Sequence, residues 1–152
     1  MHSRIIQLSK EPIKKEDYIQ EEDFYDSGFI GTVADYVSDE TDREDDINWF
    51  IQAYQLESQF NKEDDSLIIT KEYILSQFQK NFDELKSKVN KMSLEDFIDP
   101  IKSYGLQSII DGPGGFYIDS KEYGLMTFDT LLRRLLEKEE KFYIGGTVDY
   151  HF

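Results

Sequence analysis

The stretch FYIGGTVDYHF, residues 142–152, lies at the end of the sequence and is the clearest indication that the fold contains a β-sheet. Its aromatic and β-branched residues are typical of a strand, so we expect one strand that runs to the C-terminus. Gly145 and Gly146 interrupt this strand. Paired glycines inside a strand indicate a bulge or a close approach of another part of the backbone.

The residues before this strand predict a hairpin and a short helix. Residues 116–119 and 125–127 are the two expected strands, joined by a loop, residues 120–124, of hairpin length. Thr127 is placed to cap the helix that follows. The apolar face of that helix is expected to contain Leu131, Leu132, Leu135 and Leu136. Farther upstream, the glycine-rich residues 112–115 predict a turn.

Apolar spacing predicts further helices toward the N-terminus. Residues 29–37, 47–54 and 74–89 each repeat apolar side chains every three or four positions, which favours three amphipathic helices. Ser93 is expected to cap another helix through its side-chain oxygen, and Pro100 to end or kink it.

Two short apolar runs, residues 4–9 and 67–69, complete the set of expected strands. Strands and helices alternate irregularly, and no repeat or Pro/Gly/Ser linker divides the chain. The sequence therefore predicts one α+β domain, residues 1–152, with a small, mostly antiparallel sheet and four to five helices.

Charge is distributed unevenly along this domain. The sequence holds 32 acidic and 17 basic side chains, for a net charge of −15 with both histidines neutral. Residues 11–65 alone hold 18 acidic and four basic side chains, for −14. We interpret this acidic N-terminal third as one face of the domain. The aromatic content of 14% argues against a disordered acidic tail, and the absence of cysteine excludes disulfides and thiolate metal sites.

No motif points to a catalytic residue, a cofactor or a metal site. The histidines, His2 and His151, lie near opposite ends of the sequence, and neither a zinc-binding HExxH nor a complete phosphate-binding loop is present. The acidic excess argues against direct contact with nucleic acid or an anionic membrane. No apolar run has the length of a signal peptide or a membrane span. We therefore expect a cytoplasmic protein that is not an enzyme and needs no cofactor.

The acidic clusters suggest that the protein binds a basic protein surface. Rows of carboxylates on a folded domain can occupy a groove that normally holds DNA, so a nuclease or another DNA-processing enzyme is the expected partner. The predicted contacts are Glu21, Glu22, Asp23, Asp26, Asp39, Glu40, Asp42, Glu44, Asp45 and Asp46. The leading hypothesis is a DNA-mimic inhibitor of a nucleic-acid-handling defence enzyme.

Three alternatives stay open from the sequence. The charge can serve solubility alone, as it does in many acidic proteins. The chain can form a homo-oligomer, such as a dimer, in which Phe142, Tyr143, Tyr150 and Phe152 pair subunits through an edge strand. A carboxylate-based enzyme is the third alternative, and it needs a deep pocket that holds two acids.

Several stretches resemble a family of small acidic proteins from gut Gram-positive bacteria. They are SRIIQLSKEPIKKEDYIQEEDFYD at 3–26, ADYVSD at 34–39, DDINWF at 45–50 and KFYIGGTVDYHF at 141–152. Proteins of that family accompany conjugative elements and prophages, whose accessory genes often encode anti-restriction or anti-CRISPR proteins. The resemblance implies such a context and favours the inhibitor hypothesis, but it assigns no role to any residue.

Overall fold

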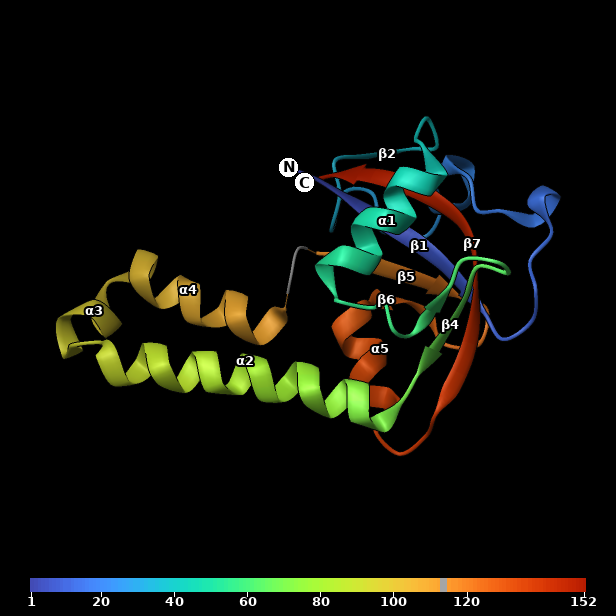
Figure 1. Ribbon diagram of the computed structural model, residues 1–152. Coiled ribbons are helices and arrows are strands. Elements are labelled where there is room, and N and C mark those ends of the chain that lie inside the picture. Colours follow the sequence, from blue (N-terminus) through green and yellow to red (C-terminus); the bar gives the residue numbers. More distant parts are fainter. Residues whose placement is uncertain (113–114) are drawn as a thin grey trace.

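A seven-stranded sheet organises the protein, as the computed structural model shows for residues 1–112 and 115–152 (Figure 1). The strands are β1 (His2–Ser9), β2 (Tyr36–Ser38), β3 (Phe60–Asn61), β4 (Ser66–Ile69), β5 (Tyr117–Ser120), β6 (Gly124–Thr127) and β7 (Glu140–His151). Their order is β3-β4-β7-β1-β5-β6, and β2 also pairs with β7. The β1–β5 pair is parallel and the other described pairs are antiparallel, which confirms the expected α+β class.

The C-terminal strand β7 lies inside the sheet, where it pairs with β1, β2 and β4. The expected interruption at the two glycines is confirmed. Ile6 pairs with Thr147 and Leu8 with Ile144, so Gly145 and Gly146 together lie opposite the single residue Gln7. This is the two-against-one count of a β-bulge.

The bulge changes which face of the sheet receives the even-numbered residues of β7. Phe142 and Ile144 belong to the larger core cluster, whereas Val148 and Tyr150 belong to a second cluster. Neighbouring residues of a strand point to opposite faces, and β1 sends Ile5 to the second cluster and Ile6 to the larger one. The extra residue of the bulge therefore lets one strand fill two cores that lie on opposite faces of the sheet.

Helices pack on the larger cluster, and irregular chain covers the other. The helices are α1 (Arg43–Ala53), α2 (Lys71–Lys91), α3 (Leu94–Ile98), α4 (Pro100–Asp111) and α5 (Phe128–Arg134), with 3₁₀ turns η1 (Lys15–Asp17) and η2 (Glu21–Phe24). Phe50 of α1, Ile74 of α2 and Leu131 of α5 are buried in the larger cluster. Ile19 and Phe29 are buried in the second. The acidic segment 11–65 thus supplies apolar side chains to both cores.

The helix expected over residues 29–37 does not form. This segment is a series of turns that leads into β2. Gly28 and Gly31 adopt left-handed φ angles of +76° and +88°, which a helix does not allow. The apolar spacing nevertheless reflects burial, because Phe29 and Ala34 are 4% exposed.

Most of the other local expectations are confirmed. Residues 47–54 fall almost entirely in α1, residues 74–89 in α2, and the predicted hairpin is β5–β6. The side chains of Ser93 and Thr127 cap α3 and α5. Pro100 separates α3 from α4 as the first residue of the latter, an additional helix that the spacing did not indicate. The turn expected over residues 112–115 includes 113–114, which lie outside the described residues.

The edge-strand route to an oligomer is wrong. Strand β7 pairs with β1 on one side and with β4 and β2 at its two ends on the other, so it is an internal strand and not an edge strand. Phe142 is fully buried and Tyr150 is 2% exposed, so neither side chain is available to a partner.

Helices α2 and α4 lie side by side and project away from the sheet, with α3 at their far end (Figure 1). We refer to residues 71–111 as the arm and to the rest of the chain as the body. From residue 75 to 112, no side chain is buried. In the described part of the chain, no helix combines the length and the apolar character needed to cross a membrane.

Candidate functional site

Four of the ten predicted contact residues have hydrogen-bond or ion-pair partners within the body. Asp42 caps α1 by accepting hydrogen bonds from the backbone N–H groups of Glu44 and Asp45, at 3.0 and 3.1 Å. Asp23 accepts one from the backbone N–H of Gln20 at 2.9 Å. Glu21 accepts one from the Tyr25 hydroxyl at 2.6 Å, and Glu44 pairs with Lys62 at 2.7 Å. These contacts explain part of the acidic excess, because carboxylates stabilise the N-termini of helices.

Asp46 is a correction to the predicted set. Its side chain is 4% exposed and forms an ion pair with Arg4, which also pairs with Asp149. The Thr147 hydroxyl donates a hydrogen bond to the second carboxylate oxygen at 2.8 Å. The carboxylate therefore joins α1 to β1 and β7 and is withdrawn from any partner.

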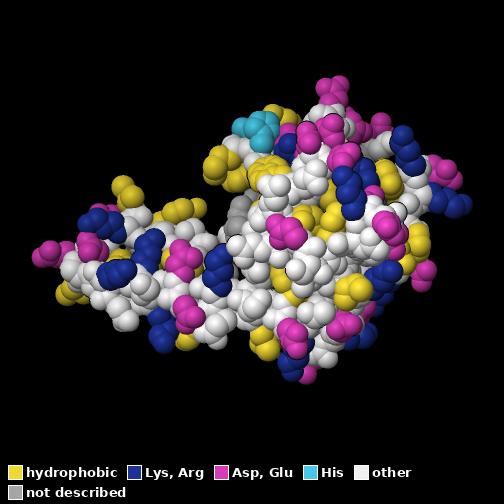
Figure 2. Space-filling model, viewed as in Figure 1, with side chains coloured by type: hydrophobic (Ala, Val, Ile, Leu, Met, Phe, Trp, Pro, Cys, Tyr) yellow, Lys and Arg dark blue, Asp and Glu magenta, His cyan; other side chains and the backbone are white. Residues whose placement is uncertain are grey.

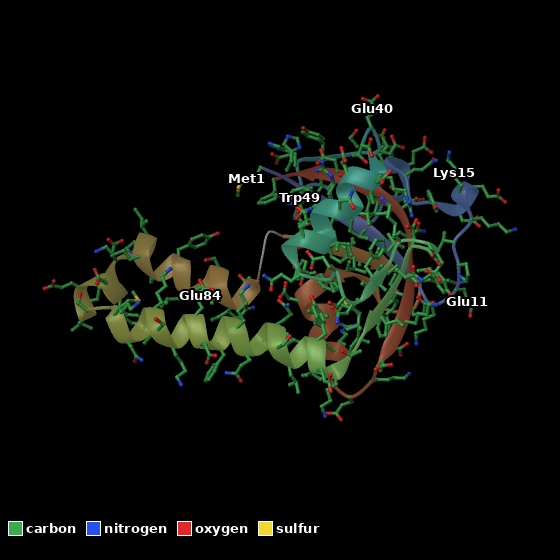
Figure 3. All side chains as sticks on the ribbon, viewed as in Figure 1. Met1, Glu11, Lys15, Glu40, Trp49 and Glu84 are labelled. Atoms are coloured by element: carbon green, nitrogen blue, oxygen red, sulfur yellow. The ribbon has the colours of Figure 1, made fainter. Side chains whose placement is uncertain are left out.

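The remaining five residues of the set are exposed. They are Glu22, Asp26, Asp39, Glu40 and Asp45. No side-chain hydrogen bond or ion pair within the described residues neutralises them. Figure 2 shows acidic side chains gathered over the end of the body formed by β2 and the start of α1, and Figure 3 places Glu40 at its outermost point.

The acidic side chains of η2 and of the chain after β2 lie near the same tyrosine. The pKa of the Tyr25 hydroxyl is raised, mainly by its hydrogen bond to Glu21, and the charges of Glu22 and Asp39 are smaller causes of the same sign. The 3₁₀ turn η2 and the chain after β2 thus place their carboxylates close to the same ring. The structure brings together acids that lie about 17 positions apart in the sequence.

The arm differs from the body in charge. Residues 71–111 hold six lysines and seven acidic side chains, for −1, so the other 111 residues carry −14. The charge asymmetry of the sequence is therefore also an asymmetry in space.

The arm also differs from the body in its apolar surface. Nine large apolar side chains of the arm are between 42% and 84% exposed. They are Leu75, Phe82, Val89, Leu94, Phe97, Ile98, Ile101, Tyr104 and Ile110. Covering each would contribute about 1 kcal/mol, or on the order of 10 kcal/mol in total before the costs of association. Exposed apolar surface on this scale is typical of interaction sites.

A cavity of about 270 Å³ at the junction of arm and body contains two carboxylates, Asp111 and Asp129. Asp129 is 8% exposed, and its carboxylate accepts a hydrogen bond from the Tyr54 hydroxyl at 2.8 Å. The Tyr73 hydroxyl donates to the backbone carbonyl of Tyr54 at 2.7 Å. Burial raises the pKa of both hydroxyls, and the Asp129 charge adds to this effect.

Burial also raises the pKa of Asp129, more than the Tyr54 hydrogen bond lowers it. No cation within the described residues forms an ion pair with Asp129. A buried carboxyl with a raised pKa in a cavity is a feature of catalytic acids and bases, although structural groups share it. The sequence offered no signal for this site, because Tyr54, Tyr73 and Asp129 meet only in the folded chain.

Replacing Asp129 with Asn is expected to remove a pH-dependent loss of stability. The folded protein holds the Asp129 proton to a higher pH than the unfolded chain does, so stability falls as pH rises from about 4 through the pKa of the folded state. The stability of the Asn variant relative to wild type should therefore increase over this interval. Urea unfolding at pH 3.5, 5 and 7 measures the difference, with the exposed Asp26→Asn as control. An equal stability difference at all three pH values would contradict the prediction.

The two histidines, remote in the sequence, are neighbours in the structure. His2 and His151 are paired residues of β1 and β7, and their ring centroids are 4.9 Å apart. His2 Nδ1 lies 2.9 Å from a carboxylate oxygen of Asp149, and His151 Nδ1 lies 3.3 Å from one of Asp35. Even so, no group of three or more His, Cys, Asp or Glu side chains suited to a metal ion occurs in residues 1–112 and 115–152.

Comparison with known proteins identifies no relative of this chain. No protein-family model matches this chain, and no curated protein or solved structure is significantly similar to it.

Proposed function

We propose that this protein is a non-enzymatic, acidic binding module whose body occupies a basic surface on a partner protein. The supporting observation is the separation of charge, −14 on the body and −1 on the arm. Among the predicted contact residues, Glu22, Asp26, Asp39, Glu40 and Asp45 are exposed and have no side-chain partner within the described residues.

A nucleic-acid-handling enzyme is the partner class that this charge suits best. Duplex DNA carries about one negative charge per 1.7 Å of helix axis, and the proteins that bind it present matching Lys and Arg grooves. Carboxylates on a folded body can take the place of phosphates in such a groove. The protein would then act as a DNA-mimic inhibitor of a nuclease or a related defence enzyme, and complementary potentials would speed its association.

The test is a competition pull-down with a charge-reversed variant. The tagged wild-type protein is incubated with a lysate of a Gram-positive bacterium at about 50 mM salt, a concentration at which exposed charges are weakly screened. We expect enrichment of nucleases or other DNA-binding enzymes, and release of these proteins by added duplex DNA. The variant Glu22→Lys, Asp26→Lys, Asp39→Lys, Glu40→Lys should lower their recovery at least about tenfold. Within residues 1–112 and 115–152, none of these four side chains caps a helix or forms an ion pair.

A matched variant separates local contacts from overall charge. Glu57→Lys, Glu84→Lys, Glu137→Lys and Glu139→Lys also change the net charge from −15 to −7, at exposed positions outside the segment 21–46 that holds the predicted contacts. This variant should retain most of the recovery. Equal loss in both variants, or capture that DNA does not compete, would overturn the proposal and leave the charge as a determinant of solubility.

A carboxylate-based enzyme is the second candidate, and the cavity that contains Asp111 and Asp129 favours it. A carboxyl group in an apolar pocket can act as a general acid at neutral pH. This candidate requires turnover of a substrate, for example a nitrophenyl glycoside, that the folded Asp129→Asn variant no longer performs.

A further inference from the structure

Helix α2 carries a repeat of apolar residues that α4 leaves partly uncovered. Leu75, Phe78, Phe82, Leu85, Val89 and Met92 are spaced alternately by three and four residues, five of them within α2 and Met92 just after it. Alternate spacings of three and four form the apolar seam of a coiled coil. We call these six residues the α2 seam. Phe82 is 55% exposed and Val89 is 49% exposed.

Helix α4 lies beside the seam and leaves a groove along it. Gly105 of α4 lies close to Lys88, a residue outside the seam. A groove of about 350 Å³ then separates Leu75, Phe78, Phe82 and Leu85 of the seam from Ile109 and Ile110 of α4. Leu136 and Arg133 close the groove near the body, where the Arg133 guanidinium lies 4.5 Å from the Phe78 ring centroid. The groove is mostly apolar and open to solvent.

We propose that a second copy of this chain occupies the groove, with its own α2 running antiparallel to the first. An antiparallel two-fold contact brings together residues whose numbers have a constant sum. With a sum of 167, Leu75 meets Met92 of the second copy, Phe78 meets Val89, and Phe82 meets Leu85. Every residue of the α2 seam thus obtains an apolar counterpart, and symmetry repeats each of the three layers.

The polar residues beside the seam agree with this register. Residues that flank the seam pair with a sum two lower or two higher than the residues of the seam. On the side of α2 away from α4, where the sum is 165, Lys86 comes to lie beside Gln79 of the second copy, so two lysines do not face each other. Lys86 already lies over the Phe82 ring, 5.3 Å from its centroid, and can cover the central layer. Like charges across such a seam would oppose association, and this register avoids them.

The separation of charge also favours contact through the arms. Helix α2 has 21 residues and is therefore about 31 Å long, which is roughly four Debye lengths at physiological salt. Antiparallel arms place the two acidic bodies at opposite ends of this length. The outer part of each arm, residues 86–102, carries four lysines and three acids, for +1, and would lie next to the body of the other copy. A contact between two bodies would instead bring together two surfaces that each belong to a body with a net charge of −14.

Size measurements on the full chain test the dimer. The monomer mass is 18.0 kDa, so light scattering during gel filtration should give about 36 kDa for wild type at micromolar concentrations. Phe82→Glu inserts a charge into both central layers and should raise the dimer dissociation constant at least about thirtyfold, with an unchanged circular dichroism spectrum. Ser87→Glu, on the opposite side of α2, should leave the dimer intact. A wild-type monomer at about 100 μM, or a dimer that Phe82→Glu does not weaken, would overturn the proposal.

Cysteine cross-linking tests the register, because the chain has no cysteine of its own. The double variant Leu75→Cys, Met92→Cys should form a disulfide-linked dimer under mild oxidation, whereas each single variant should not. In a parallel dimer, each single variant would cross-link instead, and the antiparallel register would be wrong.

The dimer is independent of the proposed function. The variant with Lys at 22, 26, 39 and 40 should still dimerise, and Phe82→Glu should still capture a basic partner.

Discussion

Asp46→Ala is expected to lower the free energy of unfolding by about 2–4 kcal/mol, whereas Asp45→Ala should cost less than about 1 kcal/mol. The two residues are adjacent in the sequence and chemically identical. Asp46 is 3% exposed, and its loss deprives the Arg4 guanidinium and the Thr147 hydroxyl of their shared acceptor. A donor left without a partner in a buried position loses the hydration that it would have in the unfolded chain. Arg4 retains Asp149, which keeps the cost below that of an isolated buried charge.

Urea unfolding of the two single variants measures this difference. The comparison also bears on function, because Asp45 belongs to the exposed acids and Asp46 does not. Equal stabilities of the two variants would mean that the ion pair between α1 and β1 contributes nothing.

Gly146→Ala is expected to destabilise the protein by about 3 kcal/mol, because the new methyl group has no space. A Cβ atom at this position would lie 2.8 Å from Cβ of Tyr18 and 2.9 Å from the backbone nitrogen of Ile19. That backbone is itself fixed by Gln7, whose side-chain oxygen accepts hydrogen bonds from the N–H groups of Gly146 and Ile19 at 2.8 and 3.2 Å. The segment before η2 therefore cannot move away without breaking the contacts that hold it on the bulge.

Gly105→Ala is the matched control, since it makes the same chemical change in α4. A Cβ atom there would approach only the end of the Lys88 side chain, which can move. Alanine is also the better helix former, so the change should be neutral or stabilise the protein by up to about 1 kcal/mol. Thermal unfolding of both variants checks the pair of predictions. A tolerated alanine at 146 would show that the N-terminal segment packs loosely on β7.

Local elements with strong sequence signals were predictable. The α2 helix follows from apolar residues at helical spacing, and Ser93 and Thr127 cap helices because their side-chain oxygens accept backbone hydrogen bonds at 3.1 and 3.2 Å. The hairpin β5–β6 follows from two short runs with a turn between them. The helix expected over residues 29–37 does not form. The spacing of Phe29, Ala34 and Val37 reflects their burial in the second core cluster and not one face of a helix.

The candidate contact surface was predictable only in part. Glu22, Asp26, Asp39, Glu40 and Asp45 are accessible as expected. Nothing in the run of acids distinguishes Asp46, which turns inward, because its partners Arg4 and Thr147 come from the two ends of the chain. The cavity around Asp129 was not predictable for the same reason.

The sequence by itself determined the class of the fold, the sign and the concentration of the charge, and the position of the bulge in β7. Each of these depends on composition or on neighbours within a few residues. Only the tertiary structure decided which face each half of β7 supplies, which acids are neutralised, and where α2 is left uncovered. These outcomes depend on contacts between distant segments, and a single bulge residue reverses the facing of every later side chain in its strand. The apolar spacing of α2 predicted its helix, but only the packing of the arm showed that much of its apolar seam faces water.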